Sequence, residues 1–271
     1  MGIFGLFVLW VIIVGLLVFL FAWIIVSNSH YSWTLLKPNQ KYMVHGRKYT
    51  FPNLECTGPT YLLHDSYISQ LRKLLNYSAQ ALKDAAIDWW LTGGSLMGFQ
   101  KHGAIPMPFD DDIDIGVDDS HRAYLFSEKF ARVAEKHNLQ VIFLVGASSR
   151  LASRTGACVR LQLFGQHATL DIFFWKKVEN DKRVIKLDGW YPPNQVTYNE
   201  KEQFQFEDVY PLQKSIDVDD MLVNLPQNPK NLLIQQYGPS VLTKIIARST
   251  AVSHLFPFLV LNAMWTKIPP G

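Results

Sequence analysis

Residues 92–114 read Thr-Gly-Gly-Ser-Leu-Met-Gly-Phe-Gln-Lys-His-Gly-Ala-Ile-Pro-Met-Pro-Phe-Asp-Asp-Asp-Ile-Asp. Asp112 and Asp114 are two positions apart at the start of a predicted strand over 113–117, so their side chains project from the same face. Aspartate is a poor strand former, and two aspartates that alternate with aliphatic residues therefore indicate a functional site. A solvated acidic loop is the alternative interpretation.

A third aspartate follows on a later predicted strand. Asp171 lies within the apolar stretch 168–175, where burying an unpaired charge is costly. Two carboxylates that project together repel each other unless a cation lies between them, and Mg²⁺ prefers carboxylates together with substrate phosphate oxygens. The three aspartates therefore predict a metal centre suited to a nucleotide's phosphates, although an aspartate at a strand edge is also possible for Asp171.

Gly93-Gly94-Ser95 follows a predicted strand over 89–92 and precedes a predicted helix over 95–100. Glycine allows the backbone to approach a phosphate closely, and the amides at a helix start point toward an anion. A Gly-Gly turn alone is common, but its combination with the acidic strand is specific. Arg160, on a predicted strand over 158–164, and Lys101 are further candidate ligands of a phosphate, with an ordinary surface role as the alternative.

The composition bounds the class of protein. The chain has 271 residues, 48% of them hydrophobic, and a net charge of +3, which fits one catalytic domain with a packed core. The basic residues do not cluster into a patch, so we expect no nucleic-acid partner. Cys56 and Cys158 form neither a disulfide framework nor a zinc motif, and two free thiols are favoured over a disulfide, although pairing stays open.

The N-terminal residues 3–26 contain no charge. As a helix they span about 36 Å, enough to cross a bilayer, and they are too long for the core of a cleaved signal peptide. We therefore expect a transmembrane anchor over 3–26, a stem over 27–60 without sustained periodicity, a catalytic domain over 61–250 and an apolar tail over 251–271.

Helical and strand patterns alternate along the domain and indicate an α/β (α+β) class. Helical spacing is found over 64–87 and 120–137, and strands are predicted over 139–145 besides those named above. Several prolines after residue 175 predict turns. A short helix over 228–237 is predicted to end at Gly238-Pro239.

These residues together resemble the LicD family, which includes fukutin-like proteins. The matching motifs are Gly93-Gly94-Ser95, Lys101-His102-Gly103, Pro108-Phe109, Asp110–Asp114, Leu170–Phe173 and Tyr237-Gly238. The resemblance covers roughly 64–240. Phe109 stands where most members have Trp, and the stretch 104–109 is slightly longer than usual, which puts the acceptor pocket in doubt more than the metal site.

The resemblance implies a nucleotidyltransferase fold, a short mixed sheet flanked by helices. It implies Mg²⁺- or Mn²⁺-dependent transfer of a phospho-alcohol, such as choline phosphate or ribitol phosphate, from a CDP-linked donor to a glycan. By position, Asp112, Asp114 and Asp171 would bind the metal, and Asp110 or Asp171 would act as ligand or base. The donor's phosphates would meet a set of backbone and basic groups, namely Gly93, Gly94, Ser95, Lys101 and Arg160.

The resemblance also implies a single-pass type II protein of the Golgi or endoplasmic reticulum membrane with a lumenal catalytic domain. Asn76-Tyr77-Ser78 is a glycosylation signal consistent with that side, whereas the basic residues after the anchor weakly favour a cytoplasmic domain. Two other functions stay open. One is a nucleotidyltransferase that leaves the nucleotide on its product, and the other is a non-catalytic membrane protein that retains the fold.

Overall fold

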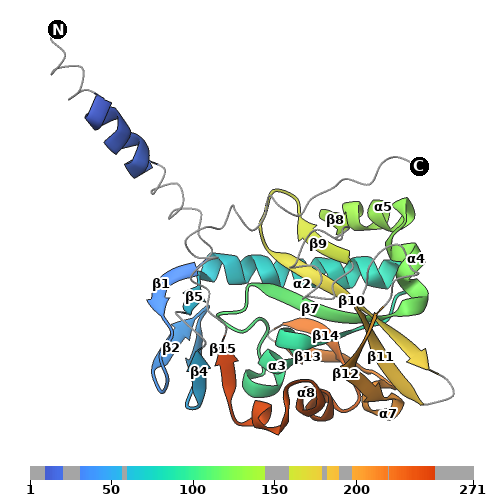
Figure 1. Cartoon of the computed structure of the whole chain (residues 1–271). Helices are drawn as coiled ribbons and strands as arrows, with labels where there is room; N and C mark the ends of the chain where they lie inside the picture. Colours follow the sequence, from blue (N-terminus) through green and yellow to red (C-terminus); the bar gives the residue numbers. More distant parts are fainter. Residues whose placement is uncertain are drawn as a thin grey trace.

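The structure is a computed structural model that describes residues 10–20, 31–56, 60–143, 159–178, 182–188, 197–218 and 220–247. Within these ranges a seven-stranded mixed sheet forms the centre of the domain, with helices packed on both sides (Figure 1). The mixed sheet with flanking helices that the family resemblance implies is therefore confirmed.

The central path of the sheet has the strand order β12-β11-β10-β7-β6, with β9 also paired to β10 and β8 paired to β9. The strands are β6 (Trp89–Leu91), β7 (Asp112–Asp118), β8 (Leu139–Phe143), β9 (Val159–Leu163), β10 (Thr169–Val178), β11 (Arg183–Asp188) and β12 (Thr197–Gln205). β7 and β10 run parallel to each other, whereas the other pairs in this sheet are antiparallel. The two strands with the predicted site aspartates are therefore direct neighbours.

The long helix α2 (Asp65–Asp84) runs along one side of the sheet with α5 (Glu128–Lys136) beyond it, and α3 (Gly93–His102) and α8 (Pro229–Tyr237) lie on the other side (Figure 1). α2 buries a stripe of leucines at helical spacing, Leu71, Leu74, Leu75 and Leu82. Shorter helical segments complete the set, namely η1 (Asp119–His121), α4 (Arg122–Leu125), α7 (Phe206–Val209) and η4 (Pro239–Leu242). The helix predicted over 120–137 is thus interrupted, whereas the helix predicted over 228–237 is confirmed.

Gly116 of β7 lies beneath two buried indoles. A Cβ atom at this position would come within 2.5 Å of the Trp90 ring and 2.8 Å of Trp175 Nε1, so only glycine lets both rings pack against the strand. The two ring centroids are 6.1 Å apart. This contact fixes β6, β7 and β10 against one another on the face of the sheet that also bears Asp112 and Asp114.

The stretch predicted as a stem has regular structure and contributes to the core. Residues 31–56 form the strands β1 (Tyr31–Leu35), β2 (Lys41–Val44), β3 (Arg47–Thr50) and β4 (Leu54–Cys56), and β5 (Tyr61–Leu63) follows. Tyr42 and Val44 alternate with exposed residues along β2, and both are buried with Phe51. The apolar side chains at period two explain why this part packs on the domain instead of forming an irregular linker.

Pairing with distant segments was not visible in the sequence. β1 pairs with β5, and β4 pairs in parallel with β15 (Ile245–Ala247), whereas β2 and β3 form a local hairpin. Beyond residue 175, where the sequence predicts turns and one short helix but no further strand, the structure has β11, β12 and the hairpin of β13 (Gln213–Val218) with β14 (Met221–Leu225). The prolines separate these strands without preventing them.

Near the N-terminus, residues 10–20 are helical with exposed apolar side chains. Within the described ranges, the structure contains no helix with both the length and the apolar character that crossing a bilayer requires. The predicted anchor over 3–26 extends beyond these ranges on both sides. The predicted tail over 251–271 and Cys158 also lie outside the described residues, and Cys56 has an exposed free thiol.

Candidate active site

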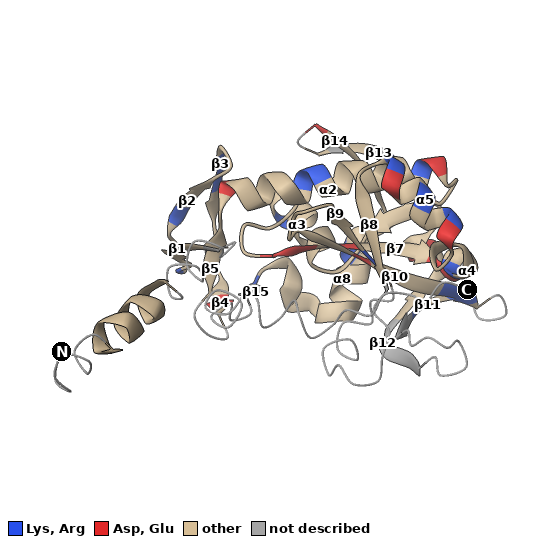
Figure 2. Ribbon diagram, turned by 90° about the horizontal axis from the view of Figure 1, so that it is seen from above, with Lys and Arg blue, Asp and Glu red and all other residues tan. Residues whose placement is uncertain are grey.

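The parallel register of β7 and β10 brings two of the predicted aspartates side by side. Asp171 of β10 is directly opposite Asp114 of β7, and Asp112 precedes Asp114 by two positions on the same face. Figure 2 shows the acidic residues of β7 near the middle of the molecule. Asp112 and Asp114 are partly buried, and only 1% of the Asp171 surface is exposed. The three predicted aspartates therefore share one face of two neighbouring strands.

The residues just before β7 add two further carboxylates. Asp110, Asp111 and Asp112 each offer a carboxylate oxygen, and these oxygens all lie within 4.8 Å of one another. This spacing fits a hard divalent cation that takes oxygen ligands. Asp111 was not among the predicted site residues, although its place in the Asp110–Asp112 run could have marked it.

The glycine turn at the start of α3 is shaped by these carboxylates. Gly93 has a φ of +52°, and a Cβ atom there would overlap the Asp114 carboxylate, while a Cβ atom on Gly94 would overlap the Asp110 carboxylate. The Gly94 N–H donates to Asp114 Oδ2 at 2.9 Å. The glycines predicted to admit a donor phosphate thus admit two protein carboxylates, and the Gly94 amide has one of them as its acceptor.

Ser95 and Thr92 attach the start of α3 to β7 by hydrogen bonds with the backbone of Asp114. The Asp114 N–H donates to Ser95 Oγ at 2.9 Å, and the Thr92 N–H donates to the Asp114 carbonyl at 3.1 Å. Ser95 is completely buried. The hydroxyl predicted to contact a phosphate therefore holds the acidic strand in position.

Arg160 forms a two-pronged ion pair with Asp171. Its Nε donates to Asp171 Oδ1 at 2.5 Å and its Nη2 donates to Oδ2 at 2.7 Å, because the antiparallel register of β9 and β10 sets the two residues opposite each other. Burial alone would lower the pKa of Arg160, but the Asp171 charge and its hydrogen bonds raise it above the ordinary value. Arg160, predicted to bind a donor phosphate, thus binds a carboxylate of the centre.

The crowding of carboxylates changes their protonation. Burial, followed by the charge of Asp114, raises the pKa of Asp112 well above its usual range. Burial and Asp171 raise the pKa of Asp114 to about 6, although the Gly94 hydrogen bond, Lys186 and Arg160 act in the opposite direction. Carboxylates that repel one another in this way favour any cation that enters between them.

Lys186 is a cation near the centre that the sequence analysis missed. It lies on β11 opposite Trp175, its side chain is buried, and its Nζ is 4.0 Å from the centroid of the Phe173 ring. Its charge contributes to lowering the pKa of Asp114. Nothing local in the sequence distinguishes Lys186 from a surface lysine, because its position depends on the pairing of β10 with β11.

Two other residues complete the surroundings of the acidic loop. The Tyr67 hydroxyl, from α2, donates to the Asp111 carbonyl at 3.0 Å, which fixes the loop before β7. Lys101, predicted as a phosphate ligand, lies in the last turn of α3, where its Nζ donates to the carbonyl of Lys244. Lys101 is therefore engaged with the β15 segment in this structure.

Comparison of the sequence with known proteins identifies a matching protein family. The model for "LicD/FKTN/FKRP, nucleotidyltransferase domain" matches residues 86–228. Human ribitol 5-phosphate transferase FKRP is 36% identical over 64 residues, which are 22% of this chain and 13% of that protein. The mouse protein of the same name is 43% identical over 47 residues, 17% of this chain and 9% of its own length.

A third relative, an uncharacterised protein of Rickettsia typhi, is 27% identical over 158 residues, or 57% of this chain and 41% of that protein. The chain thus spans less than half the length of each of these relatives. Among solved structures, a crystal structure of ANT(2")-Ia with adenylyl-2"-tobramycin has 12% identity and a TM-score of 0.31 over 58% of this chain and 69% of that chain. That likeness is too low to support an inference.

Proposed function

The chain belongs to the family of LicD/FKTN/FKRP nucleotidyltransferase domains, and on this premise we propose that it is a phosphotransferase. It moves a phospho-alcohol, of the choline phosphate or ribitol phosphate type, from a CDP-linked donor to a glycan acceptor. The observation that carries the proposal is the in-register pair Asp114 and Asp171 on two parallel strands, with Asp112 on the same face. The relatives named ribitol 5-phosphate transferase support the transferred group.

The carboxylates fit a divalent cation, Mg²⁺ or Mn²⁺. Asp110, Asp111 and Asp112 have oxygens close enough to share one ion, and Asp114 lies next to them with a raised pKa that a cation would lower again. When bound, the ion neutralises charge on the phosphoryl oxygens. Asp171, the third predicted ligand, is paired with Arg160, so in our proposal it joins the ligands only when that pair loosens.

The chain's own groups have two tasks in the transfer, which are to accept a proton and to offer positive charge. The acceptor hydroxyl forms a bond to phosphorus as the bond to CMP breaks, and a carboxylate takes the hydroxyl proton. We assign the proton to Asp110, which lies against the Gly94 turn just before β7, and in this assignment Asp111 and Asp112 hold the ion. Lys186, buried beside the centre, offers a positive charge to the donor's phosphates.

Membrane attachment is part of the proposal. The uncharged run 3–26 would anchor the chain, and the helical residues 10–20 with their exposed apolar side chains support this. We place the catalytic domain in the Golgi or endoplasmic reticulum lumen. Asn76 is exposed on α2, so a glycan that is removed by an endoglycosidase and is lost in Asn76→Gln would support the lumenal side. A catalytic domain cleaved by protease added outside intact microsomes would contradict it.

The test of the reaction is CMP release. The full-length chain is incubated with Mg²⁺, a glycan panel and CDP-alcohols such as CDP-choline and CDP-ribitol. Asp112→Asn and Asp114→Asn should abolish release, whereas Asp84→Asn should not, because Asp84 is an exposed residue on α2 paired with His137.

Mass spectrometry of the acceptor separates the proposed reaction from nucleotidyl transfer. A mass gain equal to the phospho-alcohol supports the proposal, and a gain equal to the nucleotide part contradicts it. Release that is unchanged in both aspartate variants would also contradict it, since the acidic centre would then have no part in the reaction.

A further inference from the structure

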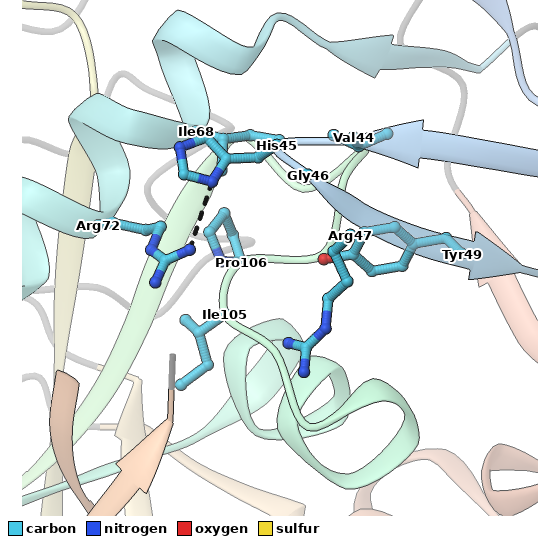
Figure 3. Close-up of a pocket in the computed structure, with 9 residues that line it drawn as sticks. All are labelled: Val44, His45, Gly46, Arg47, Tyr49, Ile68, Arg72, Ile105 and Pro106. Carbon is cyan, nitrogen blue, oxygen red and sulfur yellow. Dashed lines mark hydrogen bonds between the residues drawn. The ribbon is translucent and has the colours of Figure 1, made fainter. Parts of the chain in front are cut away.

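A pocket separate from the acidic centre lies between the β2–β3 hairpin, helix α2 and the loop after α3. Its volume is about 280 Å³, and its wall includes His45 and Arg47 from the hairpin, Arg72 from α2, and Tyr49, Ile105 and Pro106. Figure 3 shows these side chains around a common space, with the basic groups coming from two different elements. Segments distant in sequence therefore build one concave, basic site.

The basic side chains are held in place by the protein. Arg47 Nη1 donates to the Gly103 carbonyl at 2.8 Å. His45 Nε2 lies 2.9 Å from Ser69 Oγ, and Arg72 Nη1 lies 3.4 Å from His45 Nδ1. An imidazole that accepts at Nδ1 and donates from Nε2 satisfies both contacts, so His45 links Arg72 to the hairpin.

The charge of the pocket favours an anion. None of the described residues that line it is acidic. The Asp65 carboxylate accepts the backbone N–H of His45 at 2.8 Å and thereby fixes the hairpin turn. The guanidinium groups of Arg47 and Arg72 line the pocket from two sides, and each carries a planar set of N–H donors, the geometry that matches phosphate oxygens.

The remaining lining of the pocket suits a small organic group. Ile68, Ile105 and Pro106 give apolar surface, and the buried Tyr49 ring is supported by Phe51 and His102 at centroid distances of 6.1 and 5.6 Å. The volume lies just below the range of about 300–1,000 Å³ that accommodates drug-sized ligands. It therefore matches a group of the size of a sugar phosphate better than a complete CDP-alcohol.

The pocket is connected to the acidic centre by two short paths. The loop that contributes Ile105 and Pro106 leads directly to Asp110 and Asp111. On α2, the neighbour of Ile68 is Tyr67, whose hydroxyl donates to the Asp111 carbonyl. A ligand seated in the pocket thus lies on the segments that position the carboxylates.

We propose that this pocket, termed the hairpin pocket, binds a phosphate-type oxyanion carried by the acceptor, with Arg47 and Arg72 as its ligands. The donor's diphosphate belongs at the acidic centre, so a second anion site serves the other substrate. The assignment to the acceptor rests on the proposed function, whereas the anion site itself does not.

Binding is measured on the full-length chain in EDTA at constant ionic strength, with inorganic phosphate and glucose 6-phosphate as probes and glucose as the uncharged comparison. Arg72→Gln and Arg47→Gln should each lower the binding affinity for both anions by about tenfold or more. Arg132→Gln is the matched control, because Arg132 is a solvent-exposed arginine of α5. Asp112→Asn with Asp114→Asn should leave binding unchanged.

Arg72→Lys keeps the charge but removes the planar donor set, so an affinity between wild type and Arg72→Gln is expected. If the circular dichroism spectrum of Arg72→Gln differs from that of the wild type, the comparison is made with Arg72→Lys instead. Equal affinity of wild type, Arg72→Gln, Arg47→Gln and Arg72→Lys overturns the site.

Two further outcomes separate the parts of the proposal. Competition between a CDP-alcohol and glucose 6-phosphate in EDTA would overturn the assignment to the acceptor. Phosphate binding that depends on Arg72 in a chain without CMP release would leave the hairpin pocket in place and reject the transferase function instead.

Discussion

Replacing Arg160 by methionine would leave Asp171 as a buried carboxylate without its guanidinium partner. The two hydrogen bonds of this pair are 2.5 and 2.7 Å long, and the side chains are 15% and 1% exposed. Removing one partner of a buried pair costs about 3–5 kcal/mol, because the remaining charge stays desolvated. Asp114, opposite Asp171, adds repulsion that Arg160 no longer offsets.

The assay is thermal unfolding followed by circular dichroism in EDTA. For a domain of this size, about 1 kcal/mol corresponds to about 2–4 °C, so the Tm of Arg160→Met should fall by about 6–20 °C. Arg132→Met is the matched control. Arg132 pairs with Glu128 at 3.4 Å, but both side chains are mostly exposed, and such a pair contributes at most about 1 kcal/mol.

A second substitution isolates the charge. Asp171→Asn in the Arg160→Met background removes the stranded carboxylate and should recover most of the lost Tm, since the asparagine has nearly the same size. The reasoning is refuted if Arg160→Met lowers the Tm no more than Arg132→Met, or if the double variant is less stable than Arg160→Met alone. A larger Mg²⁺-induced rise in Tm for Arg160→Met than for wild type would assign Asp171 a role as a metal ligand.

Two other predictions follow from the centre. Lys186→Gln should lower the rate of CMP release by about tenfold to a hundredfold, because it removes a buried cation beside the carboxylates. Lys214→Gln is the control and should leave the rate unchanged, because Lys214 is in an exposed ion pair with Asp88. Equal rates for both variants would exclude a role for Lys186. Asp114 has a pKa of about 6 in the folded chain and about 3.9 in the unfolded chain, so the folded state binds its proton more tightly. In EDTA, the free energy of unfolding should therefore fall by on the order of 2 kcal/mol as the pH rises from about 4 to above 6. Urea unfolding at pH 4 and 7 measures this loss, and a pH dependence that is identical in Asp114→Asn would contradict it.

The shared face of Asp112 and Asp114 could be predicted because it depends on short-range geometry, whereas their meeting with Asp171 depends on the parallel pairing of β7 with β10. Side chains at period two share a face of a strand, which places Asp112 with Asp114. Asp171 stood out because it is a charge in an apolar strand. The glycine turn was also visible, but its physical role was not, since only the fold shows that Gly93 and Gly94 make room for carboxylates.

Other parts of the site depend on strand register, which local patterns do not determine. The pairing of β9 with β10 sets Arg160 against Asp171, and the pairing of β10 with β11 sets Lys186 beside the centre. The strands within 31–56 escaped prediction for a related reason. They are three to five residues long, and β4 pairs with β15, which is distant from it in the sequence.

The glycine at position 116 also gives the protein an optical property. It allows Trp90 and Trp175 to approach to 6.1 Å between ring centroids in the core. Indoles at this separation couple their electronic transitions, so the pair should produce a near-ultraviolet circular dichroism signal that exists only when β6, β7 and β10 are assembled. Because Trp175 shares β10 with Asp171, an unlabelled sample reports on the strand that bears the acidic centre, and Trp175→Phe identifies that contribution in the spectrum.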